Sequence, residues 1–279
     1  MTVAELDVSA PEVSVRIGVR SGAILALASV AGLLLFAWPL VVPSPAGWAE
    51  TQGAPIVFAA LVPVIVVIVL SQLADGGMDT RTLALLGVLT AINAALRPAL
   101  GAGTAGIEFM FVLLILAGRA FGPGFGFVLG ATSMATSALF TAGVGPWLPF
   151  QMLSAGWVGL GAGLLPGKPR GRATAGQLAM LVVYGIAAAY LYGAIMNMWS
   201  WPTLTGIATP DYGGPAGGLD YVPGAPWLDN LRRFGLYTLL TSTAGWDTGR
   251  AISTSIGLAV LGRPILDVLH RAARRARLS

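Results

Sequence analysis

Residues 109–133 read FMFVLLILAGRAFGPGFGFVLGATS. Two apolar runs meet at a short glycine-rich turn whose single charged residue is Arg119. Glycine permits a tight reversal, and Pro123 suits the first turn of a helix, where its missing N–H costs no hydrogen bond. A hydrocarbon core about 30 Å thick requires about 20 apolar residues per helical span. The stretch therefore predicts two adjacent membrane helices, at 105–120 and 122–142, that reverse direction near Arg119.

The same pattern extends over most of the chain and predicts an all-α, polytopic membrane protein. The 279 residues are 56% hydrophobic and 10% charged, whereas a soluble domain carries about 25% charged residues. About eight apolar segments have the length of a span, which indicates a helical bundle in the bilayer. The expected spans are 18–42, 54–73, 81–99, 105–120, 122–142, 147–166, 176–200 and 234–262.

The cationic side chains lie mainly in alternate gaps between these segments, which predicts a fixed orientation. With eight spans, those gaps and both termini share one face, and the positive-inside rule makes that face cytoplasmic. The gaps hold Arg16, Arg20, Arg81, Arg119, Lys168, Arg170, Arg172, Arg263, Arg271, Arg274, Arg275 and Arg277. Arg97, Arg232 and Arg233 fall on the opposite face and need another explanation. The bias toward Ala, Gly, Arg, Val and Leu indicates a GC-rich bacterium, so we expect the bacterial plasma membrane.

We expect four parts along the chain. Residues 1–17 form a cytoplasmic leader, 18–78 a transmembrane hairpin, 79–266 a six-helix functional core, and 267–279 a basic cytoplasmic tail. The leader does not resemble a cleavable signal, because the first span is too long for the apolar part of a signal peptide. The tail suits contact with anionic lipid rather than with nucleic acid, because the basic residues form no stripe.

One predicted loop, 201–233, is long and rich in proline and glycine, a composition that opposes regular structure. Its aromatic residues, among them Tyr221, argue against simple disorder, because disordered linkers are poor in aromatic residues. Two interpretations remain open: a lid over an outward-facing pocket, or a loop that rests on lipid headgroups.

Several kinds of chemistry are missing from the sequence. It contains no cysteine and one histidine, His270 in the basic tail. Its only lysine, Lys168, precedes Pro169, so no loop of the kind that binds nucleotide phosphates is present. The acids within spans, Glu108 and Asp247, are far apart in sequence and form no cluster for metal diphosphate. We therefore expect no catalytic residue, no metal and no cofactor, and any ATP hydrolysis would belong to partner subunits.

Two ion pairs are predicted near the ends of the spans. Arg97 and Glu108 flank the short connection 98–107, so we expect them to pair and clamp that corner of the bundle. Asp247 and Arg250 have i,i+3 spacing, which places them on one helical face where they can neutralise each other. A charge inside the membrane is a candidate functional group by default, although a structural pair explains the second case equally well.

Aromatic and amide side chains gather at the predicted outer ends of two spans. They are Trp147, Gln151, Tyr192, Asn197 and Trp199. One interpretation is the interfacial aromatic belt of membrane proteins. The other is a binding pocket with aromatic walls and a few hydrogen-bonding groups, to which Tyr221 of the long loop also contributes. The amides Gln151 and Asn197 favour the pocket, because a belt does not require them.

Small residues recur every four positions in the third predicted span, at Gly87, Ala91 and Ala95. Small side chains on one helix face let another backbone approach closely. They predict either packing within this bundle or docking against a separate membrane protein.

Four stretches between residues 81 and 270 resemble the substrate-binding S component of energy-coupling factor (ECF) vitamin transporters. They are LLGVLTAINAALRP (85–98), FMFVLLILAGRAFGPGFGFVLGATS (109–133), PWLPFQMLSAGWVGLGAGLLPG (146–167) and GWDTGRAISTSIGLAVLG (245–262). The two N-terminal spans are an addition to the six-helix core of that family. The whole chain resembles in particular the S components of high-GC Gram-positive bacteria that are assigned to cobalamin uptake.

The resemblance implies a vitamin or trace nutrient bound on the outer side, with cobalamin the first candidate and riboflavin or another flat heterocycle equally compatible with an aromatic pocket. It also implies docking onto a membrane coupling (T) subunit through Ala91 and Ala95, with Gly87 a weaker match. Two cytoplasmic ATPase subunits would then drive reorientation of the bundle. The alternative function is a partner-independent secondary carrier or a membrane scaffold protein.

Overall fold

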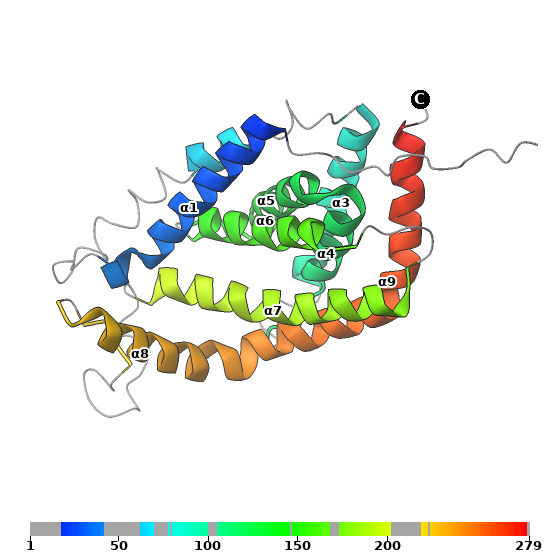
Figure 1. Cartoon of the computed structure of the whole chain (residues 1–279). Coiled ribbons are helices and arrows are strands. Elements are labelled where there is room, and N and C mark those ends of the chain that lie inside the picture. Colours follow the sequence, from blue (N-terminus) through cyan, green and yellow to red (C-terminus); the bar gives the residue numbers. More distant parts are fainter. Residues whose placement is uncertain are drawn as a thin grey trace, which may run out of the picture.

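The computed structural model describes residues 18–41, 62–69, 78, 80–99, 105–145, 147–167, 173–201, 219–222 and 224–277. Within these ranges every regular element is a helix and no residue lies in a strand, which confirms the predicted all-α class. The named elements are α1 (Val19–Val41), α3 (Thr80–Ala99), α4 (Met110–Phe121), α5 (Pro123–Phe140), α6 (Leu148–Leu164), α7 (Ala175–Ser200), α8 (Trp227–Thr238), the π-helical segment η2 (Leu239–Asp247) and α9 (Thr248–Arg277). Residues 62–69 are also helical, and Figure 1 shows them beside α1.

Three described helices are long and apolar enough to cross a membrane: Pro123–Phe140, Ala175–Trp199 and Trp227–Ala273. The shorter apolar helices are Val19–Leu34 and Met110–Phe121. The predicted leader 1–17, most of the second span and most of the loop 201–233 lie outside the described residues.

The fourth predicted span begins later than the sequence suggested, at Met110 rather than at residue 105. Ala105 and Gly106 have positive φ angles of 47° and 76°. A left-handed conformation cannot continue an α-helix. Residues 105–109 therefore form a separate non-helical connection that begins with a turn, and α4 is only 12 residues long.

The last predicted span, 234–262, is too short, because a continuous helical path runs from α8 through η2 to the end of α9. The basic residues 267–277 continue α9 as helix, and Leu266, Leu269 and Ala273 join the main apolar core. Pro264 lies inside α9, where it removes a backbone hydrogen bond and crowds the preceding turn. Figure 1 shows α9 bending sharply before its red C-terminal part, as expected for a proline kink.

Helix α4 lies at the centre of the main core, because all twelve of its residues are buried. A helix that is apolar on every side is stable only when other helices surround it. Helices α3, α5, α6, α7 and α9 all pack against it. Helices α5 and α6 approach closely, since a Cβ on Gly130 would lie 2.3 Å from the carbonyl oxygen of Ala155.

Helix α1 and residues 62–69 cover one flank of this core. Phe36 of α1 packs edge-on against Phe150 of α6, with ring centroids 4.7 Å apart. The indole nitrogen of Trp157 donates to the hydroxyl of Ser29 at 2.8 Å. The N-terminal helices therefore form a second apolar cluster on α6, which leaves α3 outside that contact.

Candidate functional site

A cavity of about 290 Å³ lies between α7, α8, η2 and α9. Small-molecule sites usually measure about 300–1,000 Å³, so this cavity is at the small end of the range. Its lining combines aromatic rings with amide, hydroxyl and charged groups. The lining residues are Tyr192, Gly193, Met196, Asn197, Tyr237, Thr241, Ser242, Trp246, Asp247 and Arg250. We call this the α7–α9 cavity.

The π-helical segment η2 forms one wall of the α7–α9 cavity. Its wider turn is visible at its end, where the hydroxyl of Thr248 donates to the carbonyl of Thr243, five residues earlier, at 2.6 Å. The segment brings Ser242 beside Asp247, and the Ser242 hydroxyl donates to Oδ2 of the carboxylate at 2.7 Å. Short π segments are rare and occur frequently at functional sites.

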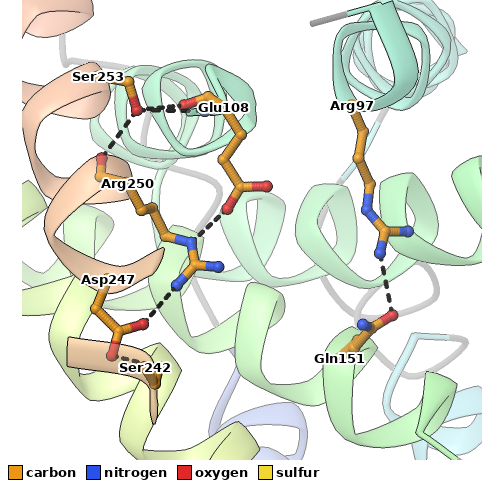
Figure 2. Close-up of polar contacts among 7 residues, drawn as sticks. All are labelled: Arg97, Glu108, Gln151, Ser242, Asp247, Arg250 and Ser253. Atoms are coloured by element: carbon orange, nitrogen blue, oxygen red, sulfur yellow. Dashed lines mark hydrogen bonds and ion pairs between the residues drawn. The ribbon is translucent and has the colours of Figure 1, made fainter. Parts of the chain in front are cut away.

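Arg250 joins two carboxylates at the edge of the cavity (Figure 2). Its Nη1 donates to Oδ1 of Asp247 at 3.0 Å, and its Nε donates to Oε1 of Glu108. The Asp247 and Arg250 side chains are 1% and 11% exposed. The Tyr192 ring lies beneath the guanidinium, whose carbon is 4.9 Å from the ring centroid. The group formed by Glu108, Asp247 and Arg250 therefore carries one net negative charge when all three are ionised.

Glycine residues set this geometry at two points. A Cβ on Gly193 of α7 would lie 1.9 Å from Oδ1 of Asp247, so only glycine leaves room for that carboxylate. A Cβ on Gly249 of α9 would lie 1.8 Å from the carbonyl oxygen of Ala105. The second contact holds the 105–109 connection against α9, where the hydroxyl of Ser253 donates to the carbonyl of Glu108 at 3.0 Å. These contacts bring the Glu108 carboxylate to Arg250.

The two predicted ion pairs have different outcomes. The Asp247–Arg250 pair is confirmed. The predicted Arg97–Glu108 pair is wrong, because Glu108 pairs with Arg250. Arg97 instead donates to Oγ of Ser137 and, through Nη2, to Oε1 of Gln151, each at 3.5 Å. Figure 2 shows the contact with Gln151. The prediction assumed that 98–107 forms a tight corner between two neighbouring spans. Residues 105–109 instead pack against α9 before α4 begins, which places Glu108 beside Arg250.

The residues predicted to bind substrate lie in four places. Tyr192 and Asn197 line the α7–α9 cavity. Trp147 and Trp199 contact each other edge-on, with ring centroids 6.4 Å apart, and neither belongs to the cavity lining. Gln151 contacts Arg97.

Tyr221, the remaining predicted residue, is buried beside Trp201, with ring centroids 5.4 Å apart. The indole nitrogen of Trp201 donates to the carbonyl of Leu219 at 2.8 Å. The side-chain amide of Asn230 in α8 both donates to and accepts from the backbone of Val222. These contacts fix residues 219–222 against α8, so Tyr221 packs in an aromatic cluster rather than in the cavity.

The sequence did not indicate most of the cavity wall formed by α8 and η2, which consists of Tyr237, Thr241, Ser242 and Trp246. The one available signal was the polar run TSTAGWD at 241–247, which interrupts an otherwise apolar segment. Nothing in that run indicates that the helix widens there.

The small residues Gly87, Ala91 and Ala95 are all exposed on α3. A Cβ on Gly87 would have no described atom within 4 Å. The opposite face of α3 packs on the core through Leu86 and Leu89. The three small residues are therefore not used for packing within the described bundle, which leaves a face open to another helix.

Residues 81–213 match the family model described as ECF transporter, substrate-specific component. The match covers just under half of the chain and runs from α3 through α7. It supports the S-component family. Searches of curated proteins and of solved structures found no match. The cavity wall formed by α8, η2 and the start of α9 lies beyond the matched residues.

Proposed function

We propose that this chain is the substrate-capture (S) subunit of an ECF-type importer in a bacterial plasma membrane. It binds a vitamin-like nutrient at the extracytoplasmic ends of the helices, with both chain termini in the cytoplasm. The observation that carries the proposal is the family match over α3–α7, a region that includes the exposed small-residue face of α3.

The α3 face supports docking onto a membrane coupling subunit. Inside a bilayer, apolar side chains gain little by leaving lipid, so close backbone approach at small residues drives helix association. Gly87, Ala91 and Ala95 offer such a strip, and each is exposed. The partners in this proposal are that coupling subunit and two cytoplasmic ATPase subunits, which hydrolyse the ATP.

The α7–α9 cavity is the proposed place for part of the substrate. Its aromatic rings suit a flat heterocycle, and its amide and hydroxyl groups can orient it. The sequence resemblance favours cobalamin. The volume of about 290 Å³ is enough for a single-ring vitamin, whereas a corrinoid would place only part of its surface there.

Transport then depends on differential binding in two states. Alone, the chain holds the nutrient in its outward state; docking and ATP hydrolysis by the partners stabilise a reoriented state that binds it less well. The chain itself acts as a binding protein and not as an enzyme. A partner-independent carrier is the contrasting function, and the buried group of Glu108, Asp247 and Arg250 would supply its coupling charges.

The first test is mass spectrometry of small molecules that co-purify with the detergent-solubilised chain expressed alone in rich medium. A stoichiometric vitamin supports a capture subunit and identifies the substrate. Proteoliposomes that contain only this chain should bind the nutrient without accumulating it. Ion-dependent accumulation by the chain alone would overturn the proposal in favour of a carrier.

A further inference from the structure

A second polar group lies apart from the α7–α9 cavity lining, where α3, α5 and α6 meet. Arg97 of α3, Ser137 of α5 and Gln151 of α6 form it, and we call it the Arg97 cluster. Both hydrogen bonds from the guanidinium are 3.5 Å long, beyond the usual range for N–H···O bonds. Among the described residues, no carboxylate lies within ion-pair distance of Arg97. Within the described part of the chain, the guanidinium therefore has two contacts, both weak and both to neutral groups.

Three buried polar side chains lie about one helical turn deeper than the Arg97 cluster. They are Asn93 of α3, Ser133 of α5 and Ser154 of α6, and we call them the polar floor. They are 1%, 2% and 2% exposed. Neither polar atom of the Asn93 amide has a hydrogen-bond partner, nor does either serine hydroxyl. Buried polar groups are nearly always paired, so three unpaired ones indicate a missing partner.

The helix register places the polar floor at one level. On α3, Asn93 lies between Thr90 and Arg97, whose side chains bond to Thr132 and Ser137 of α5. Ser133 lies within the same interval of α5. Asn93 and Ser133 therefore lie in corresponding intervals of α3 and α5, each four residues before its helix's member of the Arg97 cluster.

The third member of the polar floor follows from α6. Ser154 is three residues beyond Gln151, one turn further from the start of α6. Its neighbour Ala155 contacts Gly130 of α5, so α5 and α6 are in close register at this depth. Each of the three helices thus contributes one residue to the Arg97 cluster and one to the polar floor.

Arg97 points into the bundle rather than away from it. Cations near the end of a membrane helix commonly extend toward lipid headgroups. Figure 2 shows the Arg97 side chain directed at Gln151 of α6, and its other partner, Ser137, is 1% exposed.

We propose that the Arg97 cluster binds an oxyanion of the substrate, a carboxylate or a phosphate, and that the polar floor bonds to polar atoms beside it. The inference rests on the proposed function, because the ligand is the captured nutrient. The guanidinium presents a planar fork of donors that matches such anions in bidentate geometry. The side-chain amide of Gln151 can add a further donor.

The distribution of charged side chains makes the Arg97 cluster a better anion site than the α7–α9 cavity. The cavity is bordered by two carboxylates and a single guanidinium that is already engaged by both. An anionic group would be repelled there, whereas Arg97 offers an uncompensated positive charge. The substrate class that follows is a compact nutrient with one anionic end and an uncharged or cationic ring.

The experiment measures ligand binding by the purified full-length chain in detergent, using calorimetry and thermal stabilisation. The anionic probes are biotin, nicotinate and pyridoxal 5′-phosphate; the comparison probes, which carry no oxyanion, are thiamine and riboflavin. We expect at least one anionic probe to bind. Biotin and nicotinate carry a carboxylate and pyridoxal 5′-phosphate carries a phosphate, so their relative affinities show which oxyanion the site prefers. We expect Arg97→Gln to raise its dissociation constant at least about tenfold, because a bound charge loses its partner.

Matched variants separate a binding role from a structural one. Arg97→Lys keeps the positive charge but loses the planar set of donors, so we expect the dissociation constant to rise less than in Arg97→Gln. If Arg97→Gln does not fold, Arg97→Lys alone is compared with the parent chain. Arg232→Gln, an exposed arginine on α8, should leave binding unchanged. Binding of only uncharged or cationic probes, or equal affinity in Arg97→Gln, overturns the oxyanion site while the capture function stands. No bound nutrient in any preparation overturns both.

Discussion

The α5–α6 contact and the α7–η2 contact both depend on glycine, but backbone fills the space beside the glycine in the first and a side chain fills it in the second. A Cβ on Gly126 of α5 would lie 2.3 Å from the carbonyl oxygen of Gly159, so backbone packs directly on backbone. A Cβ on Gly193 of α7 would lie 1.9 Å from the Asp247 carboxylate, so a charged side chain fills that gap. The first contact belongs to a rigid scaffold, and the second borders the candidate cavity.

This difference shows where a ligand can enter the bundle. Backbone packed on backbone leaves no side chain that could move aside, because protein interiors are close-packed. A contact made through side chains can rearrange when a ligand arrives. Variants at the two contacts should therefore affect stability and binding in different proportions.

The largest effect is expected at Arg250. Arg250→Met leaves the Glu108 and Asp247 carboxylates without their shared cation. Removing one member of a buried charge group costs about 3–5 kcal/mol. We expect a strongly lowered melting temperature in detergent, measured against Arg263→Met, which alters an exposed arginine on the same helix. Equal melting temperatures for the two variants would contradict a structural role for the buried charges.

A smaller loss of stability is expected at the α5–α6 contact. Gly126→Ala forces these helices apart and should cost about 1–3 kcal/mol, the usual range for overpacking. Gly87→Ala is the matched control, because its new methyl group meets no described atom. Thermal unfolding of both variants tests the comparison. If they unfold alike, the α5–α6 contact is looser than described.

The next variant should change binding more than stability. Asn197 lines the α7–α9 cavity, and Asn197→Ala removes one hydrogen-bonding group from its wall. We expect the dissociation constant for the co-purified nutrient to rise about tenfold, equivalent to one buried hydrogen bond. Gln177→Ala, at the opposite end of α7, should not alter affinity. An unchanged affinity in Asn197→Ala would assign Asn197 to the interfacial belt instead.

The smallest effect on the isolated chain is expected at Ala95. Ala95→Leu lies on the exposed face of α3, so stability and nutrient affinity should stay close to those of the parent chain. Uptake by cells that contain the complete transporter should nevertheless fall sharply, because a bulky side chain keeps the partner helix away. Ala187→Leu, on an exposed face of α7, is the control. Loss of affinity and uptake in equal measure would reject docking at this face.

The sequence predicted the helical class and most helix positions, because hydrophobic length alone decides where a membrane helix can form. Helices α5 and α6 begin and end within about three residues of the predicted spans. The Asp247–Arg250 pair was also predictable, since local helical spacing determines it.

The remaining parts of the site depend on long-range packing. Glu108 reaches Arg250 because Gly249 admits the 105–109 connection, and no local pattern indicates that contact. The widened turn of η2 is likewise absent from the sequence pattern. The burial of Asn93 without a hydrogen-bond partner likewise results from tertiary packing and not from a local pattern.

The π segment η2 also determines how α8 is rotated about its axis relative to α9. Each residue of an α-helix advances the chain by about 100° around its axis. Deleting one residue within 239–247 would therefore rotate α8 and its cavity residue Tyr237, while α9 stays fixed by Leu258 and Leu266 in the core. Insertions and deletions here would redirect one wall of the cavity while the core around α4 keeps its packing, and we expect them to alter ligand preference.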